Sequence, residues 1–382
     1  MQKAYKLQGV HKHYDWGGSQ FITALMNLPN PTNKPYAEYW MGAHPSAPAM
    51  IKTPEGDTSI QHFLDKKGLP YLFKILDVAN MLSIQVHPTI ENAIKGFEDE
   101  EQKGIPIDAS HRNYKDKNHK PEVMVALSDF WLLHGFLAPD LLEARLHEFT
   151  FFHPLLDQFK RGGYQQLYSY FMQLSNQESD LILAPIMRDA ISSVQKGSVD
   201  KSHPHWWAYK YYKGEVPLEN IDKGIFSIYI LNIVQVSKYE GVFQGAGLLH
   251  AYLEGQNIEL MSNSDNVLRG GLTTKHVDVP ELIEHVRFEP TYPEILKGVQ
   301  LNANEQNFPC PVSDFGLSKI VLKRGETYTI QSEALEMLLC LEGQIELDSL
   351  QLNAGEVAMV PACQQLELKA PADAVVFRSF VP

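Results

Sequence analysis

The chain has few cysteines, a deficit of basic charge and no long apolar segment, and each shortage excludes a class of protein. Its cysteines are Cys310, Cys340 and Cys363, three among 382 residues. An odd number of widely spaced cysteines does not predict a disulfide framework. Lysine and arginine together number 33 against 46 aspartate and glutamate residues, so the formal net charge is −13. Because nucleic-acid-binding proteins normally present a basic face, we expect no nucleic-acid partner.

The lack of long apolar segments bears on location. No segment approaches the roughly 18 apolar residues that a membrane helix requires, so we expect no membrane partner. The opening residues, MQKAYKLQGVHKHYDWGG, contain no apolar signal core. The sequence therefore predicts a cytoplasmic protein. Because the whole chain is acidic, an anionic substrate would need a local basic pocket.

Apolar residues, 44% of the chain, are arranged in β-rich and helical parts. Up to about residue 134, short runs such as PYLFKILDVA and EVMVALS alternate with turns, which is typical of strands. Between about 138 and 222, apolar residues recur every three or four positions, which predicts helices. The strand pattern returns near residue 225. A separate short helix is expected within ENAIKGFEDEEQKG, residues 91–104.

This patterning predicts a mainly β protein with a helical insertion. We assign residues 1–134 and 225–300 to one discontinuous β domain, residues 135–224 to an inserted helical domain and residues 301–382 to a C-terminal β domain. In the C-terminal part, strands, turn glycines and the segment GEVAMVPA are typical of a small jelly roll. That part contains no histidine, so we expect no histidine-based metal site there.

The segment SIQVHP places Gln85 and His87 two positions apart. In an extended strand, two such side chains point to the same face. Polar side chains on a buried face are costly unless something satisfies them, so that face is either hydrated or holds an ion. Taken alone, the hydrated face is the simpler interpretation.

Two further segments supply possible metal ligands. Glu122 stands at the start of the strand EVMVALS, and His250 follows the glycine-rich turn in GAGLLH. Two imidazoles, one carboxylate and the amide oxygen of Gln85 together suit Zn²⁺ or a similar divalent cation. Each residue also has a plain structural interpretation, as a strand end or as a core histidine.

Two other histidine pairs have the same spacing. His11 and His13 lie beside the turn DWGG, and His203 and His205 lie at the end of the helical part. We expect neither pair to bind a metal.

A basic, glycine-containing loop, LRGGLTTK (residues 268–275), follows His250 in the sequence. Its Arg269 and Lys275, together with free backbone amides, could hold a phosphate group. The alternative is an ordinary solvated turn. Glu259 lies nine residues after His250 on the same expected strand and could face the same cavity.

Four separated segments, in their order, resemble the type I mannose-6-phosphate isomerase family. They are YAEYWMGAHPSAP (36–48), LFKILDVANMLSIQVHP (72–88), NYKDKNHKPE (113–122) and HAYLEGQNIELMSNSDNVLRGGLTTK (250–275). The resemblance runs to about residue 300. It implies a cupin-type jelly-roll catalytic barrel, an inserted α-helical domain and a second small jelly roll at the C-terminus.

The same resemblance implies a zinc-dependent aldose–ketose isomerase that interconverts mannose 6-phosphate and fructose 6-phosphate. It implies one Zn²⁺ per chain and a small-molecule sugar phosphate as the partner, and we expect a monomer. The implied zinc ligands are Gln85, His87, Glu122 and His250, and the implied catalytic arginine is Arg269. Other family pocket positions fall on Trp16, Ser83, Lys120, Tyr252, Glu259, Asp265 and Lys275. The sequence departs from the family at Thr274, where proline is common, and at Leu260, where cysteine is common; neither position supplies a ligand.

The reaction would move a proton between C1 and C2 through an enediol, and the sequence leaves its carrier open. Glu259 is the first candidate, with Lys120 or a water on the zinc as alternatives. Glu259 could instead orient His250 or Lys120. Arg269 could hold phosphate or stabilise the enediol, and Ser83 and Lys74 could add donors.

Two rival functions are weighed against this one. An Fe(II) oxygenase on a cupin barrel would share the two histidines and one carboxylate, but its activity would depend on dioxygen. A sugar-binding protein without activity would be expected to have lost a metal ligand, and none is lost.

Overall fold

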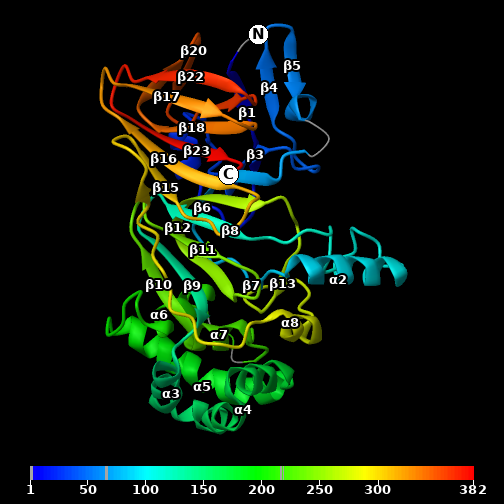
Figure 1. The fold of residues 1–382 in the computed structure, drawn as a ribbon. Helices are drawn as coiled ribbons and strands as arrows, with labels where there is room; N and C mark the ends of the chain where they lie inside the picture. The colour runs from blue at the N-terminus through cyan, green and yellow to red at the C-terminus, as the bar shows by residue number, and fades with distance from the viewer. Residues whose placement is uncertain (1–2, 65–67, 216, 218) are drawn as a thin grey trace.

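The computed structural model describes residues 3–64, 68–215, 217 and 219–382, and within these ranges the protein is mainly β-sheet with a block of helices (Figure 1). The described strands form three sheets of ten, nine and four strands. In Figure 1 the ten-stranded sheet lies in the middle, the other two sheets lie above it and most helices lie below it.

The ten-stranded sheet carries most of the residues that the sequence singled out. Its main path runs β10-β9-β12-β6-β3-β2, and β8 and β7 attach to it by pairing with β12. Its strands are β2 (Val10–Lys12), β3 (Glu38–Gly42), β6 (Tyr71–Val78), β7 (Gln85–Val86), β8 (Glu122–Ala126), β9 (Phe130–Phe136), β10 (Leu231–Val236), β11 (Gly241–Gln244), β12 (His250–Ser262) and β13 (Leu268–Arg269).

The nine-stranded sheet joins the two ends of the chain. Its order is β14-β15-β16-β23-β18-β21-β1-β4-β5, and the pairing of β1 with β21 sets Tyr5 opposite Met359. Its strands are β1 (Tyr5–Gln8), β4 (Met50–Thr53), β5 (Gly56–Ser59), β14 (Val299–Gln300), β15 (Glu305–Phe308), β16 (Gly316–Leu322), β18 (Glu336–Glu342), β21 (Val357–Val360) and β23 (Ala374–Phe380). The sheet therefore crosses the boundary proposed at residue 301, and the division into domains stays a prediction.

The four-stranded sheet covers the nine-stranded one. Its order is β17-β22-β19-β20, and its apolar residues Leu366 and Leu368 share a core with Leu338 and Cys340 of β18. The strands are β17 (Thr327–Ser332), β19 (Gln344–Leu347), β20 (Leu350–Asn353) and β22 (Gln364–Lys369). The prediction that the last 80 or so residues are β-rich is confirmed.

The helical block lies between β9 and β10 in the sequence. Its helices are α3 (Pro139–Glu148), α4 (His153–Gln173), α5 (Asn176–Gln195), α6 (Pro204–Tyr211) and α7 (Gly224–Ile230), with the 3-10 turn η2 (Thr150–Phe152). The remaining described helices are α1 (Phe21–Leu25), η1 (Ile60–Phe63), α2 (Ile90–Gln102) and α8 (Val279–His285). The predicted helical part and the short helix α2 are confirmed.

The prediction of a strand from about residue 225 is wrong for its first residues. Gly224–Ile230 forms the helix α7, and strand β10 begins only at Leu231. All seven residues of α7 are buried. A short, continuously apolar run such as GIFSIYI fits a buried helix as well as a buried strand, so periodicity could not separate the two.

Alternation along the central strands separates two faces of the ten-stranded sheet. Phe73 of β6 and Leu260 of β12 lie in the apolar core shared with the nine-stranded sheet. Lys74 and Glu259, the neighbours of these residues in sequence, therefore point to the other face. The β6–β12 register sets Glu259 opposite Lys74. The apolar core thus fixes the register that brings these two charged side chains together.

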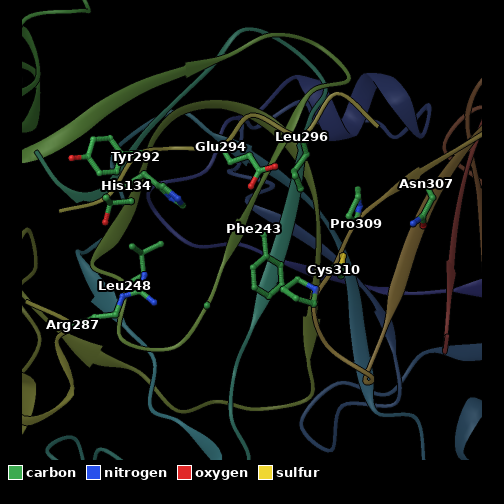
Figure 2. Close-up of a pocket in the computed structure, with 13 residues that line it drawn as sticks. His134, Phe243, Leu248, Arg287, Tyr292, Glu294, Leu296, Asn307, Pro309 and Cys310 are labelled. Carbon is green, nitrogen blue, oxygen red and sulfur yellow. The ribbon is translucent and has the colours of Figure 1, made fainter. Parts of the chain in front are cut away.

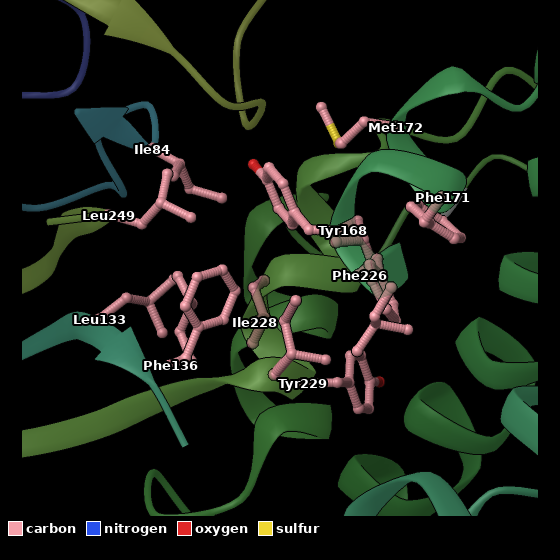
Figure 3. Close-up of a cluster of buried hydrophobic side chains, with 14 of the residues drawn as sticks. Ile84, Leu133, Phe136, Tyr168, Phe171, Met172, Phe226, Ile228, Tyr229 and Leu249 are labelled. Carbon is pink, nitrogen blue, oxygen red and sulfur yellow. The ribbon is translucent and has the colours of Figure 1, made fainter. Parts of the chain in front are cut away.

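The helical block packs directly against the strands that carry the candidate site. Figure 3 shows Ile84 and Leu249 grouped with Tyr168 of α4 and Phe226 of α7 in one buried apolar cluster. Ile84 immediately precedes one predicted metal ligand, and Leu249 immediately precedes another. The position of the helices is therefore coupled to the position of these ligands through close packing.

Candidate metal centre and its cavities

Within the described ranges, one cluster of histidine, cysteine and acidic side chains has the spacing of a metal site, and it consists of His87, Glu122 and His250. The potential ligand atoms of these residues all lie within 4.8 Å of one another. The Nε2 atom of His87 lies 3.4 Å from Oε1 of Glu122, and Nε2 of His250 lies 3.4 Å from Oε2. All three side chains are buried.

Hydrogen bonds fix the orientation of both imidazole rings. Nδ1 of His87 lies 3.0 Å from the carbonyl oxygen of Asn266, and Nδ1 of His250 lies 2.9 Å from that of Leu248. A carbonyl oxygen can only accept, so each Nδ1 carries the proton and each Nε2 presents a lone pair. Nε2 of His87 is buried without a hydrogen-bond partner among the described residues. A divalent cation between these atoms would satisfy it.

Gln85, the fourth residue predicted as a ligand, lies beside this cluster. Its strand β7 pairs with β12, which sets Gln85 opposite His250. Gln85, Glu122 and His250 line the same small cavity. Two imidazole nitrogens, one carboxylate and one amide oxygen are a donor set that fits zinc, so the residues present are suited to hold that ion.

Local structure explains how two of these ligands are placed. Glu122 is the first residue of β8, and His250 is the first residue of β12. The turn before β12 contains Gly247, whose φ of +80° favours glycine. The N–H of Gly247 donates to the carbonyl oxygen of His87 at 3.0 Å. The predicted glycine turn therefore connects two ligand segments that are far apart in the sequence.

The surroundings of the cluster keep Glu122 and His87 in the protonation states that a metal needs. Lys120 Nζ lies 3.1 Å from Oε1 of Glu122. Burial raises the pKa of the Glu122 carboxyl, but Lys120 and the imidazoles outweigh burial and hold that pKa well below its usual value. Burial and then the charge of Lys120 lower the pKa of His87 to about 4. The carboxylate is therefore ionised and the His87 imidazole neutral at neutral pH.

A second polar group, formed by Lys74, Glu259 and Tyr252, lines the same cavity. Lys74 Nζ lies 2.9 Å from Oε1 of Glu259, and the Tyr252 hydroxyl donates to Oε2 at 2.8 Å. Burial raises the pKa of Glu259, and the charge of Lys74 offsets only part of this effect. The two oxygens of Glu259 thus bond to Lys74 and Tyr252, and the alternative in which Glu259 orients His250 or Lys120 stays a prediction.

Two adjoining cavities contain the predicted site. The inner cavity has a volume of about 60 Å³ and the outer one of about 930 Å³, and they share Lys74, Gln85 and Lys120 among their lining residues. Of the remaining predicted residues, Tyr252 and Glu259 line the inner cavity. Five others line the outer cavity, namely Trp16, Ser83, Asp265, Arg269 and Lys275. The structure thus brings every predicted site residue to one region.

The outer cavity has a basic side formed by Arg269 and Lys275. Burial lowers the pKa of Arg269, and burial followed by the charge of Arg269 lowers the pKa of Lys275. No acidic side chain offsets these effects in the part of the chain that the structure describes. Two unpaired cations at a cavity wall favour an anionic ligand group.

The expectation that free backbone amides of this loop hold a phosphate is wrong for four residues. The N–H of Gly270 donates to the carbonyl oxygen of Ile84. The N–H groups of Leu272 and Thr273 donate to the carboxylate of Asp222. The N–H of Lys275 donates to the hydroxyl of Thr273. These four N–H groups are therefore already occupied and are not free to hold an anion.

Sequence reasoning missed several residues that support the site. Glu38 lies 3.9 Å from Lys74 Nζ and accepts a hydrogen bond from the Trp40 indole. His44 Nε2 lies 3.1 Å from the Asp265 carboxylate. Glu38 is a charged residue in the wholly buried strand EYWMG, and such a residue is a signal that could have been used.

The two histidine pairs that we did not expect to bind a metal have structural partners. His11 packs against the rings of Tyr36 and Tyr39. His203 accepts a hydrogen bond from the N–H of His205 at the start of α6. Neither pair belongs to the metal-type cluster found among the described residues.

A further cavity, of about 670 Å³, lies outside the predicted site. Figure 2 shows His134, Phe243, Arg287 and Glu294 among the side chains that line it. None of the predicted ligands or pocket residues lines this cavity. The cavities beside Glu122 and Lys74 therefore remain the candidate site.

No helix in the described part of the chain is long and apolar enough to cross a membrane.

Comparison with known proteins gives one consistent result. Residues 4–138 match the family model for the catalytic domain of phosphomannose isomerase type I. The chain is 36% identical to a mannose-6-phosphate isomerase of Shigella flexneri and 35% identical to that of Escherichia coli (strain K12), with 94% of each chain covered in both cases. A structure of mannose 6-phosphate isomerase from Salmonella typhimurium, bound to its substrate and to zinc, is similar with a TM-score of 0.88 and 32% identity over the whole of both chains.

Proposed function

Because this chain belongs to the type I phosphomannose isomerase family, we propose that its buried metal centre and adjoining cavities interconvert mannose 6-phosphate and fructose 6-phosphate. The observation that carries the proposal is the buried His87–Glu122–His250 cluster beside a cavity of about 930 Å³. Two cations that line that cavity, Arg269 and Lys275, suit the phosphate group of such a substrate.

We assign the metal to zinc, held by Gln85, His87, Glu122 and His250. Related structures contain zinc, and the donor set of this chain fits that ion. A bound Zn²⁺ supplies a Lewis acid that polarises the sugar carbonyl oxygen. The two backbone carbonyls that accept from the imidazoles fix the ring orientations before any ion binds.

Glu259 is the residue that we assign to proton transfer between C1 and C2. Its carboxylate lines the inner cavity, and its raised pKa brings it closer to the range of an effective general base. Lys74 and Tyr252 hold its two oxygens in place. Lys120, which lines both cavities, is the second candidate for this role.

The outer cavity would hold the rest of the sugar phosphate. Arg269 and Lys275 are assigned to the phosphate end and to the negative charge that develops on the enediol. Trp16, Ser83 and Asp265 line the same cavity and are assigned to contacts with the sugar. His44 pairs with Asp265 and so restricts the position of that carboxylate.

We further propose that the ten-stranded sheet is a cupin-type jelly roll with its site inside the barrel. The support is that Gln85 of β7, Glu122 of β8 and His250 of β12 line one cavity. A second small jelly roll at the C-terminus, the division into three domains, a cytoplasmic location and a monomeric state stay predictions.

Removal and return of the metal test the proposed function. Isomerase activity on mannose 6-phosphate should disappear after chelation and return with Zn²⁺, with close to one zinc per chain by metal analysis. Mg²⁺ is a suitable control because it prefers oxygen ligands in octahedral geometry and should not restore activity. A folded, zinc-loaded protein without isomerase activity would contradict the proposal, and activity that requires dioxygen would favour the oxygenase.

A further inference from the structure

Asp222 connects the helical block to the loop that carries Arg269 and Lys275. It lies between α6 and α7. Its carboxylate accepts hydrogen bonds from the N–H groups of Leu272 and Thr273 at 2.8 and 2.9 Å. The same carboxylate accepts from the N–H at the first residue of α7 at 2.7 Å. One side chain therefore holds the loop against the helical block.

The backbone of the loop needs such a partner. Gly271 has a φ of +117° and Leu272 a φ of +54°, so two consecutive residues lie in the left-handed region, which is unfavourable for leucine. The N–H groups of Leu272 and Thr273 converge on one carboxylate, in the manner of an anion-binding backbone nest. Asp222 occupies this nest and thereby stabilises the strained conformation.

Close packing adds to the hydrogen bonds. A Cβ atom placed on Gly271 would lie 2.5 Å from the Cα of Gly224, so the loop backbone touches the start of α7. The hydroxyl of Tyr212 accepts from the N–H of Asp222 at 2.8 Å, and the hydroxyl of Tyr211 donates to its carboxylate at 3.3 Å. Both tyrosines line the outer cavity that Arg269 and Lys275 also line.

We propose that Asp222 is a positioning residue for substrate binding. By fixing residues 270–273 from the helical block, it sets where Arg269 and Lys275 present their charges to the phosphate group. The identity of that ligand rests on the proposed function; the fixing of the loop does not. The helical block thus takes part in substrate recognition without placing a side chain at the reacting atoms.

Kinetics of zinc-loaded enzyme test this role, with inorganic phosphate as a probe of the phosphate end. In Asp222→Ala, the KM for mannose 6-phosphate and the inhibition constant of inorganic phosphate should both rise about tenfold. The fall in kcat should be smaller than this rise, because only the part of the charge that acts at the enediol affects kcat. Asp222→Asn keeps the shape and one acceptor oxygen, so both constants should rise by an intermediate factor. This second variant decides the matter if Asp222→Ala does not fold.

Asp200 offers a matched control in the same block. Its carboxylate accepts from the N–H and the hydroxyl of Ser202 at 2.9 and 2.6 Å, and among the described residues it makes no hydrogen bond to the loop. Asp200→Ala should leave both constants unchanged. An equal rise in Asp200→Ala, or unchanged constants in both Asp222 variants, would overturn the positioning role.

Hydrogen exchange gives a readout that needs no activity. Backbone amides in peptides spanning residues 270–275 should exchange faster in Asp222→Ala than in the wild type and Asp200→Ala. If the wild type did not isomerise mannose 6-phosphate, the proposed function would fail, yet this exchange difference would still decide the role of Asp222. Unchanged exchange in the Asp222 variants would overturn it.

Discussion

Lys74 is a charged residue in a strand in which every residue is buried. An unpaired ammonium group in such surroundings would be costly. Here Glu259 lies 2.9 Å and Glu38 3.9 Å from its Nζ. Burial by itself lowers the pKa of Lys74, but the charges of these carboxylates outweigh burial and raise that pKa above its usual value. The side chain therefore stays charged and holds Glu259 at the inner cavity.

Glu259→Gln tests whether this carboxylate carries the proton. The amide keeps the shape of the side chain but cannot exchange a proton at neutral pH. General acid–base catalysis typically contributes about 10²- to 10⁴-fold, so kcat for mannose 6-phosphate should fall by about that factor. Steady-state kinetics together with metal analysis would check this, because the zinc content should not change.

Glu254 provides the control for that substitution. It lies on the same strand, β12, and its carboxylate also bonds to lysines, Lys201 at 2.6 Å and Lys210. It lines neither of the two site cavities. Glu254→Gln should therefore keep kcat within about twofold of the wild type. If Glu259→Gln behaved in the same way, the proton carrier would be Lys120 or another group.

The sequence identified possible ligands more readily than the residues that support them. Gln85, His87 and Glu122 lie in segments whose polar residues interrupt apolar strands, and the family resemblance groups them. The contact between Glu38 and Lys74 depends instead on the pairing of β3 with β6. Local periodicity gives the face on which each side chain lies, but it does not give which strands are neighbours.

The loop between β13 and Lys275 depends on the first residue of α7. Gly271 has a positive φ, and its backbone lies against Gly224. Gly104, which follows α2, also has a positive φ, of +67°, but a Cβ atom there would meet nothing within 4 Å. Both glycines therefore have a positive φ, but only Gly271 is in close contact with another segment.

Gly271→Ala should destabilise the protein much more than Gly104→Ala. Both substitutions place alanine at a positive φ, which costs roughly 1 kcal/mol or more. Gly271→Ala also forces the loop away from α7, and overpacking of this kind typically costs a further 1–3 kcal/mol, roughly. Urea denaturation would measure both free energies of unfolding. Equal losses in the two variants would show that the loop is not held tightly against the helix.

The helix α7 also shows where sequence reasoning about elements ends. The helices from α3 to α6 have spaced apolar residues, so periodicity predicted them. The segment Gly224–Ile230 is buried on every side and has no polar face. Its helical state is decided by the surrounding core, which includes Phe152 and Phe171, and not by a pattern of its own.

The arrangement of the sheets is a property of the whole chain. β1, β4 and β5 from the N-terminal part complete the nine-stranded sheet, whose other strands come from the C-terminal part. Residues of the nine-stranded and the ten-stranded sheet share one apolar core. The sequence predicted β-rich parts at both ends but could not pair them, because strands separated by some 350 positions leave no local signal of their contact. A C-terminal block that folded independently would lack β1 beside β21.

We therefore expect the C-terminal block, residues 301–382, and the rest of the chain to unfold as one cooperative unit. Leu339 of β18 is fully buried in the shared core, so Leu339→Ala should lower the free energy of unfolding by about 2–5 kcal/mol. The tryptophans, which all precede residue 301, are Trp16, Trp40, Trp131, Trp206 and Trp207. Their fluorescence should nevertheless shift to a lower urea midpoint, together with far-UV circular dichroism.

Leu301→Ala, at a side chain that is 57% exposed, should change stability by less than about 0.5 kcal/mol. An unchanged fluorescence midpoint beside an earlier dichroism transition would instead make the C-terminal block a separate folding unit.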